Sequence, residues 1–252
     1  MPETETSTII TPSSKKEFEV DYPKNSSHFA AIRYIFECGL RLNTNSTTLA
    51  IASTYYHKFF ELCEVKDYDI YTIASTCIYI ASKVTNDDIK VRDIINVSNN
   101  CLHPKAEPLS LDPYLTIRDS LMYTELLIMR VLGFQLTVEL PHKYLLHYLN
   151  SLKDWLGEET FKNFPLVKTS WSLLQDSYYN PLSIKYSPQL LAVSAIYLSL
   201  QIYGVIVPGC DELNDKPWYC VLHTDCTTSA VWEVSSSIMK LYEQENELIL
   251  IQ

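Results

Sequence analysis

The sequence has 252 residues, of which 47% are hydrophobic and 20% charged, so it can bury the core of one large domain or of two smaller ones. Its net charge of −10 argues against nucleic-acid binding, because that affinity comes mainly from Lys and Arg at phosphates. Its five glycines form no phosphate-binding motif, so we expect no nucleotide or other cofactor and infer a protein partner.

Seven irregularly spaced cysteines and the absence of an apolar leader are typical of a reducing compartment. We therefore expect an intracellular protein, located in the nucleus, the cytoplasm or both. Residues 1–24 are rich in Thr, Ser, Glu and Lys and are predicted to form a disordered arm. Within this arm, Thr11-Pro12 is either a proline-directed phosphorylation site or an unmodified part of the tail.

Hydrophobic periodicity predicts five helices in the first half of the chain. The third, from Ile70 to Lys83, has no charge before its final lysine and no face suited to water, so we expect it to be the buried central helix. Ala74 and Ala81 are small enough to let neighbouring helices approach closely. The five predicted helices span residues 28–42, 46–63, 70–83, 90–98 and 114–132.

A glycine stop and a proline start mark residues 133–141 as a connector, with the linker itself at 135–141. Beyond it, LAVSAIYLSLQ aligns with IASTCIYIASK of the central helix at a constant offset, which indicates a duplicated scaffold. The alignment places Gln201 opposite Lys83, so only the first half carries the charge. Five further helices are predicted, over residues 142–156, 165–179, 188–203, 217–223 and 228–244.

The uncharged stretch from residue 190 to residue 207 is long enough to resemble a membrane span. It contains Ser194, Ser199 and Gln201 and has no basic cluster on either flank. We therefore interpret it as a buried helix and expect no membrane association.

Two charged residues need an explanation. Lys83 ends the central helix, and Glu125 lies on an apolar stripe of the fifth helix, where an unpaired carboxylate is unfavourable. One interpretation is an internal salt bridge from Glu125 to Lys83 or Arg118. The other is that Lys83 and Glu125 border an exposed apolar patch and bind polar groups of a partner protein.

These features resemble the tandem cyclin boxes of the cyclin family. The resemblance covers residues 26–242, and it is carried by YIASK in the third helix, TELLIMRVLGFQL in the fifth and ELPHKYLLHYL beyond the connector. Longer blocks are similar to the cyclin Q (cyclin M) subfamily, whose kinase partner is cyclin-dependent kinase 10. These blocks are RDIINVSN, PHKYLLHYLNSL, WSLLQDSYY, IYGVIVP and KPW.

The resemblance implies an all-α fold with two tandem five-helix cyclin boxes, at residues 25–134 and 142–244, and a tail at 245–252. It implies that the chain is not an enzyme but the activating subunit of a cyclin-dependent kinase, expected to be cyclin-dependent kinase 10, in a heterodimer. The chain would hold the C helix of the kinase in its active position, and the kinase would supply ATP, magnesium and the catalytic aspartate. The kinase interface is predicted at Lys83, Glu125, Ile80, Val84, Met122 and Met129.

The sequence departs from the family pattern at two places. Val84, Thr85 and Asn86 follow the lysine, where cyclins often have an acidic pair. The substrate-docking motif of cell-cycle cyclins would fall at Ser27–Ala31 and is absent. We therefore do not predict docking of short substrate motifs at that patch.

Other interpretations remain open. A zinc site formed by Cys220, His223 and Cys226, with Cys210 upstream, is disfavoured because the spacings differ from those of common fingers. His142 and His147 are five residues apart, which is a poor spacing for shared metal ligation, so no metal is expected. The chain could also be a cyclin-fold scaffold that activates no kinase, or a transcription-associated protein that binds promoter DNA, which its acidic charge opposes.

Overall fold

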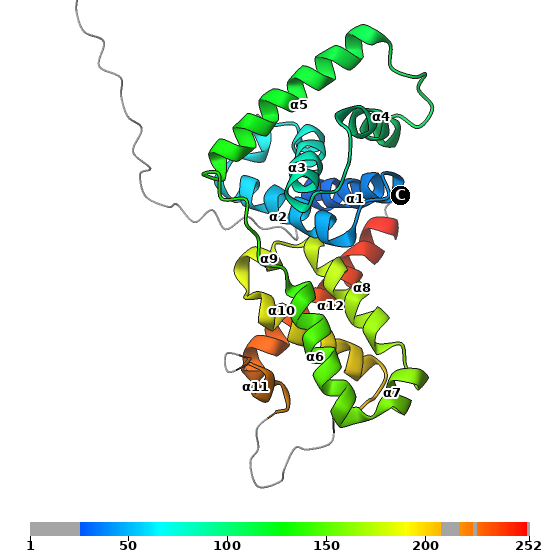
Figure 1. The fold of residues 1–252 in the computed structure, drawn as a ribbon, viewed down its shortest axis with the longest axis vertical. Helices are drawn as coiled ribbons and strands as arrows, with labels where there is room; N and C mark the ends of the chain where they lie inside the picture. Colours follow the sequence, from blue (N-terminus) through cyan, green and yellow to red (C-terminus); the bar gives the residue numbers. More distant parts are fainter. Residues whose placement is uncertain (1–25, 208–216, 224–225, 251–252) are drawn as a thin grey trace, which may run out of the picture.

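The computed structural model describes residues 26–207, 217–223 and 226–250, and in these ranges the secondary structure is entirely helical. Figure 1 shows two helical bodies stacked along the long axis of the molecule, the first half of the chain above and the second half below. The predicted all-α fold is confirmed. The arm at residues 1–24, Thr11 and Cys210 lie outside the described residues.

The five predicted helices of the first half are all present. α4 continues to Leu102, past the predicted end at Ser98. α5 begins at Leu111, before the predicted start at Tyr114, because Pro113 falls in the first turn, where proline is tolerated. The helices are α1 (Ser26–Arg41), α2 (Ser46–Leu62), α3 (Ile70–Thr85), α4 (Val91–Leu102) and α5 (Leu111–Val131), and a 3₁₀-helix (Val65–Asp67) precedes α3.

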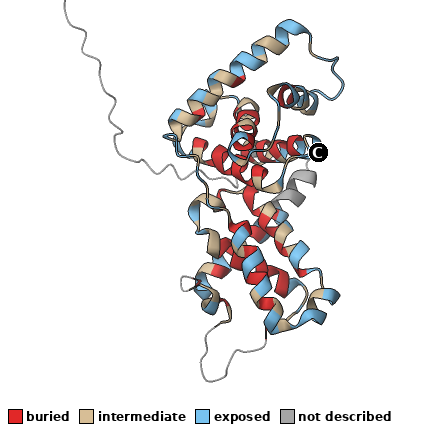
Figure 2. Ribbon diagram, in the orientation of Figure 1, coloured by how far each residue is buried: buried red, intermediate tan, exposed pale blue. Residues whose placement is uncertain are grey.

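α3 is the central helix of the first half, as predicted. It contacts α1, α2, α4 and α5, and Figure 2 shows the buried residues of this half concentrated on it and its neighbours. The side chains from Ile73 to Ser82 are buried apart from Tyr79, which is partly exposed. Asp69 caps the helix by accepting a hydrogen bond from the Thr72 backbone N–H at 2.8 Å.

The second half contains more helices than predicted. Two short ones, α7 and α9, were missed, because a single turn or two of helix leaves little periodicity to detect. α12 ends at Leu250 instead of Gln244. The helices are α6 (Pro141–Leu156), α7 (Glu158–Asn163), α8 (Leu166–Asp176), α9 (Leu182–Lys185), α10 (Pro188–Ile202), α11 (Tyr219–Leu222) and α12 (Thr228–Leu250), and a 3₁₀-helix (Ser177–Tyr179) follows α8.

α10 occupies in the second half the place that α3 has in the first. It packs against α6, α8 and α12, and its side chains from Leu190 to Leu200 are buried apart from Tyr197. The aligned pairs Ala74/Ala192 and Ile78/Ile196 are all fully buried, which fits the duplication seen in the sequence. Across the described residues, no helix combines the length and the apolar character that a membrane crossing needs.

The 3₁₀-helix Ser177–Tyr179 and α9 connect the two bodies by packing on α1 and α2. His57 of α2 forms a hydrogen bond through Nε2 with the backbone carbonyl of Tyr178 at 2.7 Å. The ring of Tyr179 packs against Phe29 and Phe36 of α1, with centroid distances of 4.8 and 5.3 Å. The second half therefore inserts the aromatic side chain of Tyr179 against α1 of the first.

Candidate functional site

The packing of α5 on α3 brings Lys83 and Glu125 together. Leu121 and Ile128 of α5 are buried, and Glu125 lies between them on the same face of the helix at i+4 and i−3. Lys83 lies in the last turn of α3, where a cation is favoured by the helix dipole. Asn86 ends α3 in the left-handed conformation, with φ 56°, and its backbone N–H donates to the Ser82 carbonyl.

Lys83 Nζ donates a hydrogen bond to Glu125 Oε1 at 2.6 Å, and the two side chains are 48% and 12% exposed. The ammonium also lies 3.9 Å from the centroid of the Tyr79 ring, at cation–π distance. Partial burial by itself would lower the pKa of Lys83, but the hydrogen bonds to Glu125 and Tyr79 outweigh it and raise that pKa above its usual value. The ammonium is therefore fully charged at neutral pH.

Of the two interpretations of this pair, the structure contains the salt bridge, with Lys83 rather than Arg118 as the partner of Glu125. Arg118 pairs with its neighbour Asp119 at 2.9 Å. The salt bridge does not exclude binding to a partner, because Lys83 remains half exposed and an ammonium has three hydrogens to donate. The pair lies at the molecular surface and not in the core.

The four apolar residues predicted beside the pair differ in exposure. Val84 is exposed, while Met122 and Met129 are partly buried along α5. Ile80 is only 2% exposed and belongs to the core of the first half, because it lies on the face of α3 that packs against its neighbours. Ile80 therefore supports the surface from beneath and offers no surface of its own.

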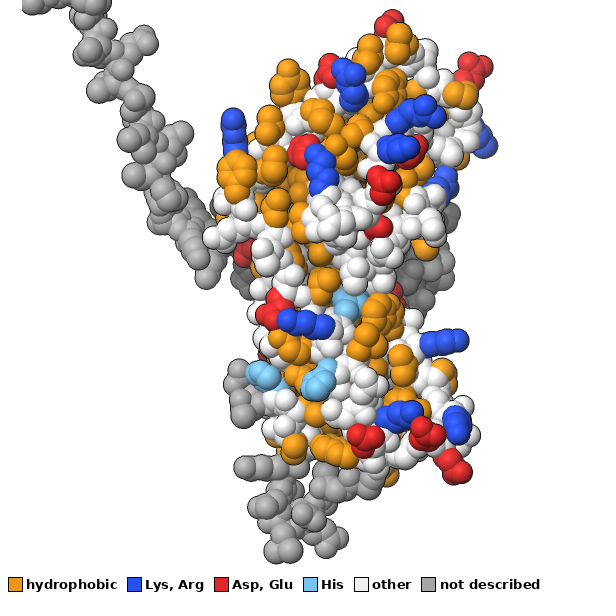
Figure 3. All heavy atoms as spheres, viewed as in Figure 1, with side chains coloured by type: hydrophobic (Ala, Val, Ile, Leu, Met, Phe, Trp, Pro, Cys, Tyr) orange, Lys and Arg blue, Asp and Glu red, His pale blue; other side chains and the backbone are white. Residues whose placement is uncertain are grey.

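Three exposed apolar side chains on α5 and in the turn after it were missed by sequence analysis. Tyr123 and Leu126 lie on the outer face of α5, and Tyr123 is 75% exposed. Phe134 follows α5, and Gly133 and Phe134 both have positive φ, so the aromatic ring is held outward in the turn. Figure 3 shows hydrophobic side chains gathered along α5 and below it. The α5 sequence is apolar on both faces, and this could have indicated an uncovered side.

The cysteine and histidine side chains considered for metal binding take part in hydrogen bonds and packing within the fold. Cys220 Sγ donates to the backbone carbonyl of Cys226 at 3.2 Å, and Cys226 is buried. No group of three His, Cys, Asp or Glu side chains in the described ranges is placed to hold a metal ion. His142 is buried against the Trp171 ring and forms a 3.3 Å hydrogen bond with Gln175, while burial lowers its pKa.

Residues Ser27–Ala31, where the resemblance would place a docking motif, lie at the start of α1. His28 and Ala31 of this segment are buried, and His28 Nδ1 and Tyr56 Oη form a 3.0 Å hydrogen bond. The segment thus contributes to the core between α1 and α2.

Comparison with known proteins identifies the family. Residues 4–137 match the family described as "Cyclin, N-terminal domain", which is more than half of the chain. The chain belongs to the cyclin family. Its fold is also that of a chain in the yeast RNA Pol II CTD kinase CTDK-1 complex, with a TM-score of 0.66 at 16% identity over 86% of this cyclin and 65% of that chain.

Related cyclins come from animals and yeast. The cyclin is 31% identical to Cyclin pch1 of Schizosaccharomyces pombe over 77% of its length and 55% of the relative. It is 28% identical to Cyclin-K of Homo sapiens over 84% of its length and 36% of the relative. A chain in yeast TFIIK (Kin28/Ccl1/Tfb3) has a TM-score of 0.56 at 17% identity, over 84% of this cyclin and 86% of that chain. The cyclin thus spans about a third to a half of the length of these sequence relatives.

Proposed function

We propose that this cyclin is the activating, non-catalytic subunit of a cyclin-dependent kinase. The observation that carries the proposal is the Lys83–Glu125 pair at the molecular surface, next to two exposed apolar side chains, Val84 of α3 and Leu126 of α5. In addition, the chain belongs to the cyclin family, and its fold neighbours include chains of kinase complexes.

The geometry of the pair suits the capture of backbone groups of a partner. Glu125 and the Tyr79 ring hold the Lys83 ammonium in one place, so little side-chain freedom is lost when a carbonyl oxygen binds to its exposed side. The second carboxylate oxygen of Glu125 can accept an N–H of the same partner. The apolar residues around the pair would supply burial, and the charges would set register and orientation.

The proposed mechanism is a shift in the conformational population of the kinase. A kinase is active when the glutamate of its C helix pairs with the lysine that binds ATP, and a rigid partner that binds only this arrangement favours it. α3 is rigid enough for this role, since its side chains from Ile73 to Ile78 are buried among neighbouring helices. Met122 and Met129 can adapt their shape to the C helix.

For the kinase itself we propose cyclin-dependent kinase 10, because the blocks RDIINVSN, PHKYLLHYLNSL and WSLLQDSYY resemble the cyclin Q subfamily. A second candidate is a kinase that phosphorylates RNA polymerase II, which is favoured by the likeness to the CTDK-1 chain and to Cyclin-K. Co-expression with a panel of cyclin-dependent kinases that includes both types, followed by phosphorylation assays, separates the two candidates.

The role of the pair is tested by charge exchange. Lys83→Glu and Glu125→Lys should each reduce binding to the partner kinase at least tenfold, because each places a like charge opposite the partner's polar group. The double variant Lys83→Glu with Glu125→Lys restores the internal salt bridge, yet it should bind as weakly as the single variants. Binding is measured by calorimetry with the purified kinase, and folding by circular dichroism.

A matched control lies in the second half of the chain. Lys143 of α6 and Glu139, which precedes that helix, form an exposed salt bridge of the same length, 2.6 Å. Lys143→Glu should leave kinase binding within twofold of the unchanged protein. Full recovery of binding in the Lys83/Glu125 double variant would show that the pair is only a structural salt bridge, and would refute the proposed contact.

A further inference from the structure

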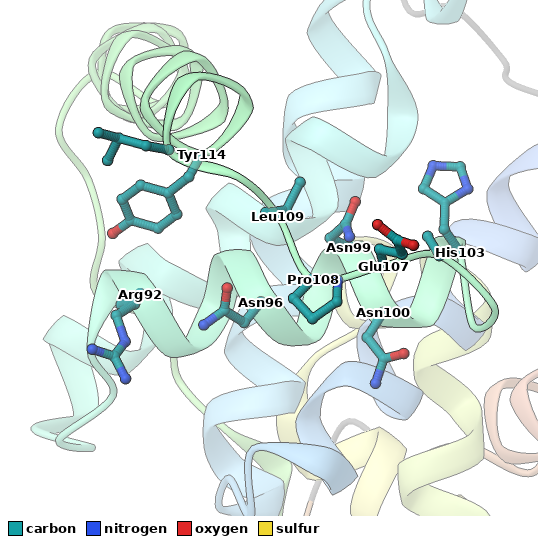
Figure 4. Close-up of a pocket in the computed structure, with 11 residues that line it drawn as sticks. Arg92, Asn96, Asn99, Asn100, His103, Glu107, Pro108, Leu109 and Tyr114 are labelled. Carbon is teal, nitrogen blue, oxygen red and sulfur yellow. The ribbon is translucent and has the colours of Figure 1, made fainter.

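A groove on the first half lies between α4, the loop that follows it and the start of α5. Its volume is about 590 Å³, which is within the range of known ligand sites. We call it the α4 groove (Figure 4); its lining includes Arg92, Asn96, Asn100, Glu107, Pro108 and Tyr114. Tyr114 is about 16 Å along the α5 axis from Glu125, so the groove is separate from the proposed kinase surface.

Polar side chains line the α4 groove at regular spacing. Arg92, Asn96 and Asn100 follow one another at every fourth residue, and Figure 4 shows them in a row along α4. Three more lining residues, Asn99, His103 and Glu107, continue the polar surface toward the end of α4. Within the described part of the chain, no hydrogen bond or ion pair uses the side chains of Arg92, Asn96 or Asn100. Their donors and acceptors are available to a ligand.

The spacing of this row matches an extended peptide. Residues four apart on a helix are separated by about 6 Å along the axis. Every second residue of an extended chain is separated by about 6.6 Å. A carboxamide both donates and accepts, so Asn96 and Asn100 can each bind the N–H and C=O of alternate residues of such a peptide. This is recognition of the main chain, which does not depend on the peptide's side chains.

The two ends of the α4 groove carry opposite charges. Arg92 lies at one end of it, and Glu107 lies toward the other. A guanidinium binds carboxylates in a bidentate manner, whereas Glu107 repels a second acidic group. Pro108 of the loop and Tyr114 of α5 add an apolar wall, against which aliphatic or proline side chains can pack.

We propose that the α4 groove binds an extended segment of a protein partner. The main chain of that segment hydrogen-bonds to Asn96 and Asn100, and an acidic side chain of the segment pairs with Arg92. The groove gives this cyclin a second docking surface, distinct from the proposed kinase surface.

The test uses the 252-residue chain and a phage library of random linear eight-residue peptides. Selected peptides should share one acidic residue at a fixed position. Measured by fluorescence polarisation, Asn96→Ala and Asn100→Ala should each weaken binding of the selected peptide at least tenfold. Arg92→Glu should change the residue preferred at that position from Glu to Lys. Methylation of single backbone nitrogens of the peptide should abolish binding at every second residue and leave it unchanged at the residues between.

The matched control is Asn150→Ala, an exposed asparagine on α6 that should change peptide affinity by less than twofold. Selection of no peptide above background would overturn the proposal. So would peptides that bind equally well to the Asn96→Ala/Asn100→Ala variant, or an N-methylation profile without alternation. Salt-dependent binding of a single-stranded 20-nucleotide RNA that is lost in Arg92→Glu would also overturn it, in favour of a nucleic-acid site.

Discussion

His57 shows how a single residue connects burial to the stability of the whole chain. It is buried at the junction of the two halves, where its Nε2 meets the Tyr178 carbonyl. Burial disfavours the charged imidazolium and lowers the pKa of His57 to about 4. An unfolded chain titrates this group near pH 6.5 and therefore binds the proton more readily than the folded chain does.

We therefore expect acid to destabilise the protein in the window between pH 6.5 and pH 4. Below the unfolded pKa, protonation favours the unfolded state, so His57 alone should reduce the free energy of unfolding by about 2 kcal/mol from pH 7.5 to pH 5. Urea denaturation at both pH values measures the change. His57→Gln, which retains a donor for the Tyr178 carbonyl, should show a smaller pH dependence than the unchanged protein, and an equal dependence would contradict this account.

At the scale of elements, α1 and α2 pack at Gly39. A Cβ added to Gly39 would collide with the side chain of Leu49, which is itself 5% exposed and cannot move into solvent. The close approach of these helices supports α3, on which Lys83 is carried. The absence of a side chain at position 39 is therefore a packing requirement.

Gly39→Ala should lower the free energy of unfolding by about 1–3 kcal/mol, although alanine is the better helix former. Overpacking against Leu49 outweighs the gain in helix propensity. In a Leu49→Ala background, which removes the obstruction, Gly39→Ala should instead be neutral or stabilising. Urea midpoints of the four proteins complete a double-mutant cycle, and purely additive effects would disprove the collision.

At the scale of the molecule, the two halves are coupled through the 3₁₀-helix Ser177–Tyr179 and α9. Tyr179 packs against two phenylalanines of α1, and His57 reaches into the second half. Because of these contacts, we expect both halves to unfold together. It also fixes the orientation of the first half, which carries both proposed binding surfaces.

Tyr179→Ala should remove the ring contacts to Phe29 and Phe36 and weaken this coupling by about 2–4 kcal/mol. Differential scanning calorimetry of the unchanged protein should give one transition, and that of the variant two, or one at a lower temperature with a calorimetric enthalpy that exceeds the van't Hoff enthalpy. Tyr123→Ala, at an exposed position on α5, is the control and should leave the transition within about 2 °C. A single sharp transition at an unchanged temperature in Tyr179→Ala would refute the coupling.

Much of this protein could be predicted from its sequence. The uncharged stretch of α3 predicted its burial, because a helix without a polar face cannot lie on a surface. Helical periodicity predicted the five helices of the first half, and the repeat of α3 in α10 indicated the duplication. Lys83 and Glu125 were identified because each is a lone charge in an apolar setting.

Only the tertiary structure decided which charges and faces meet. Whether Glu125 pairs with Lys83 or Arg118 depends on how α5 packs on α3, and the two residues are 42 positions apart in the sequence. The same packing buries Ile80 and exposes Tyr123, although both are large hydrophobic residues in helices. Local pattern determines which segments form helices, whereas the distances between segments follow from the packing of the whole core, which no local pattern contains.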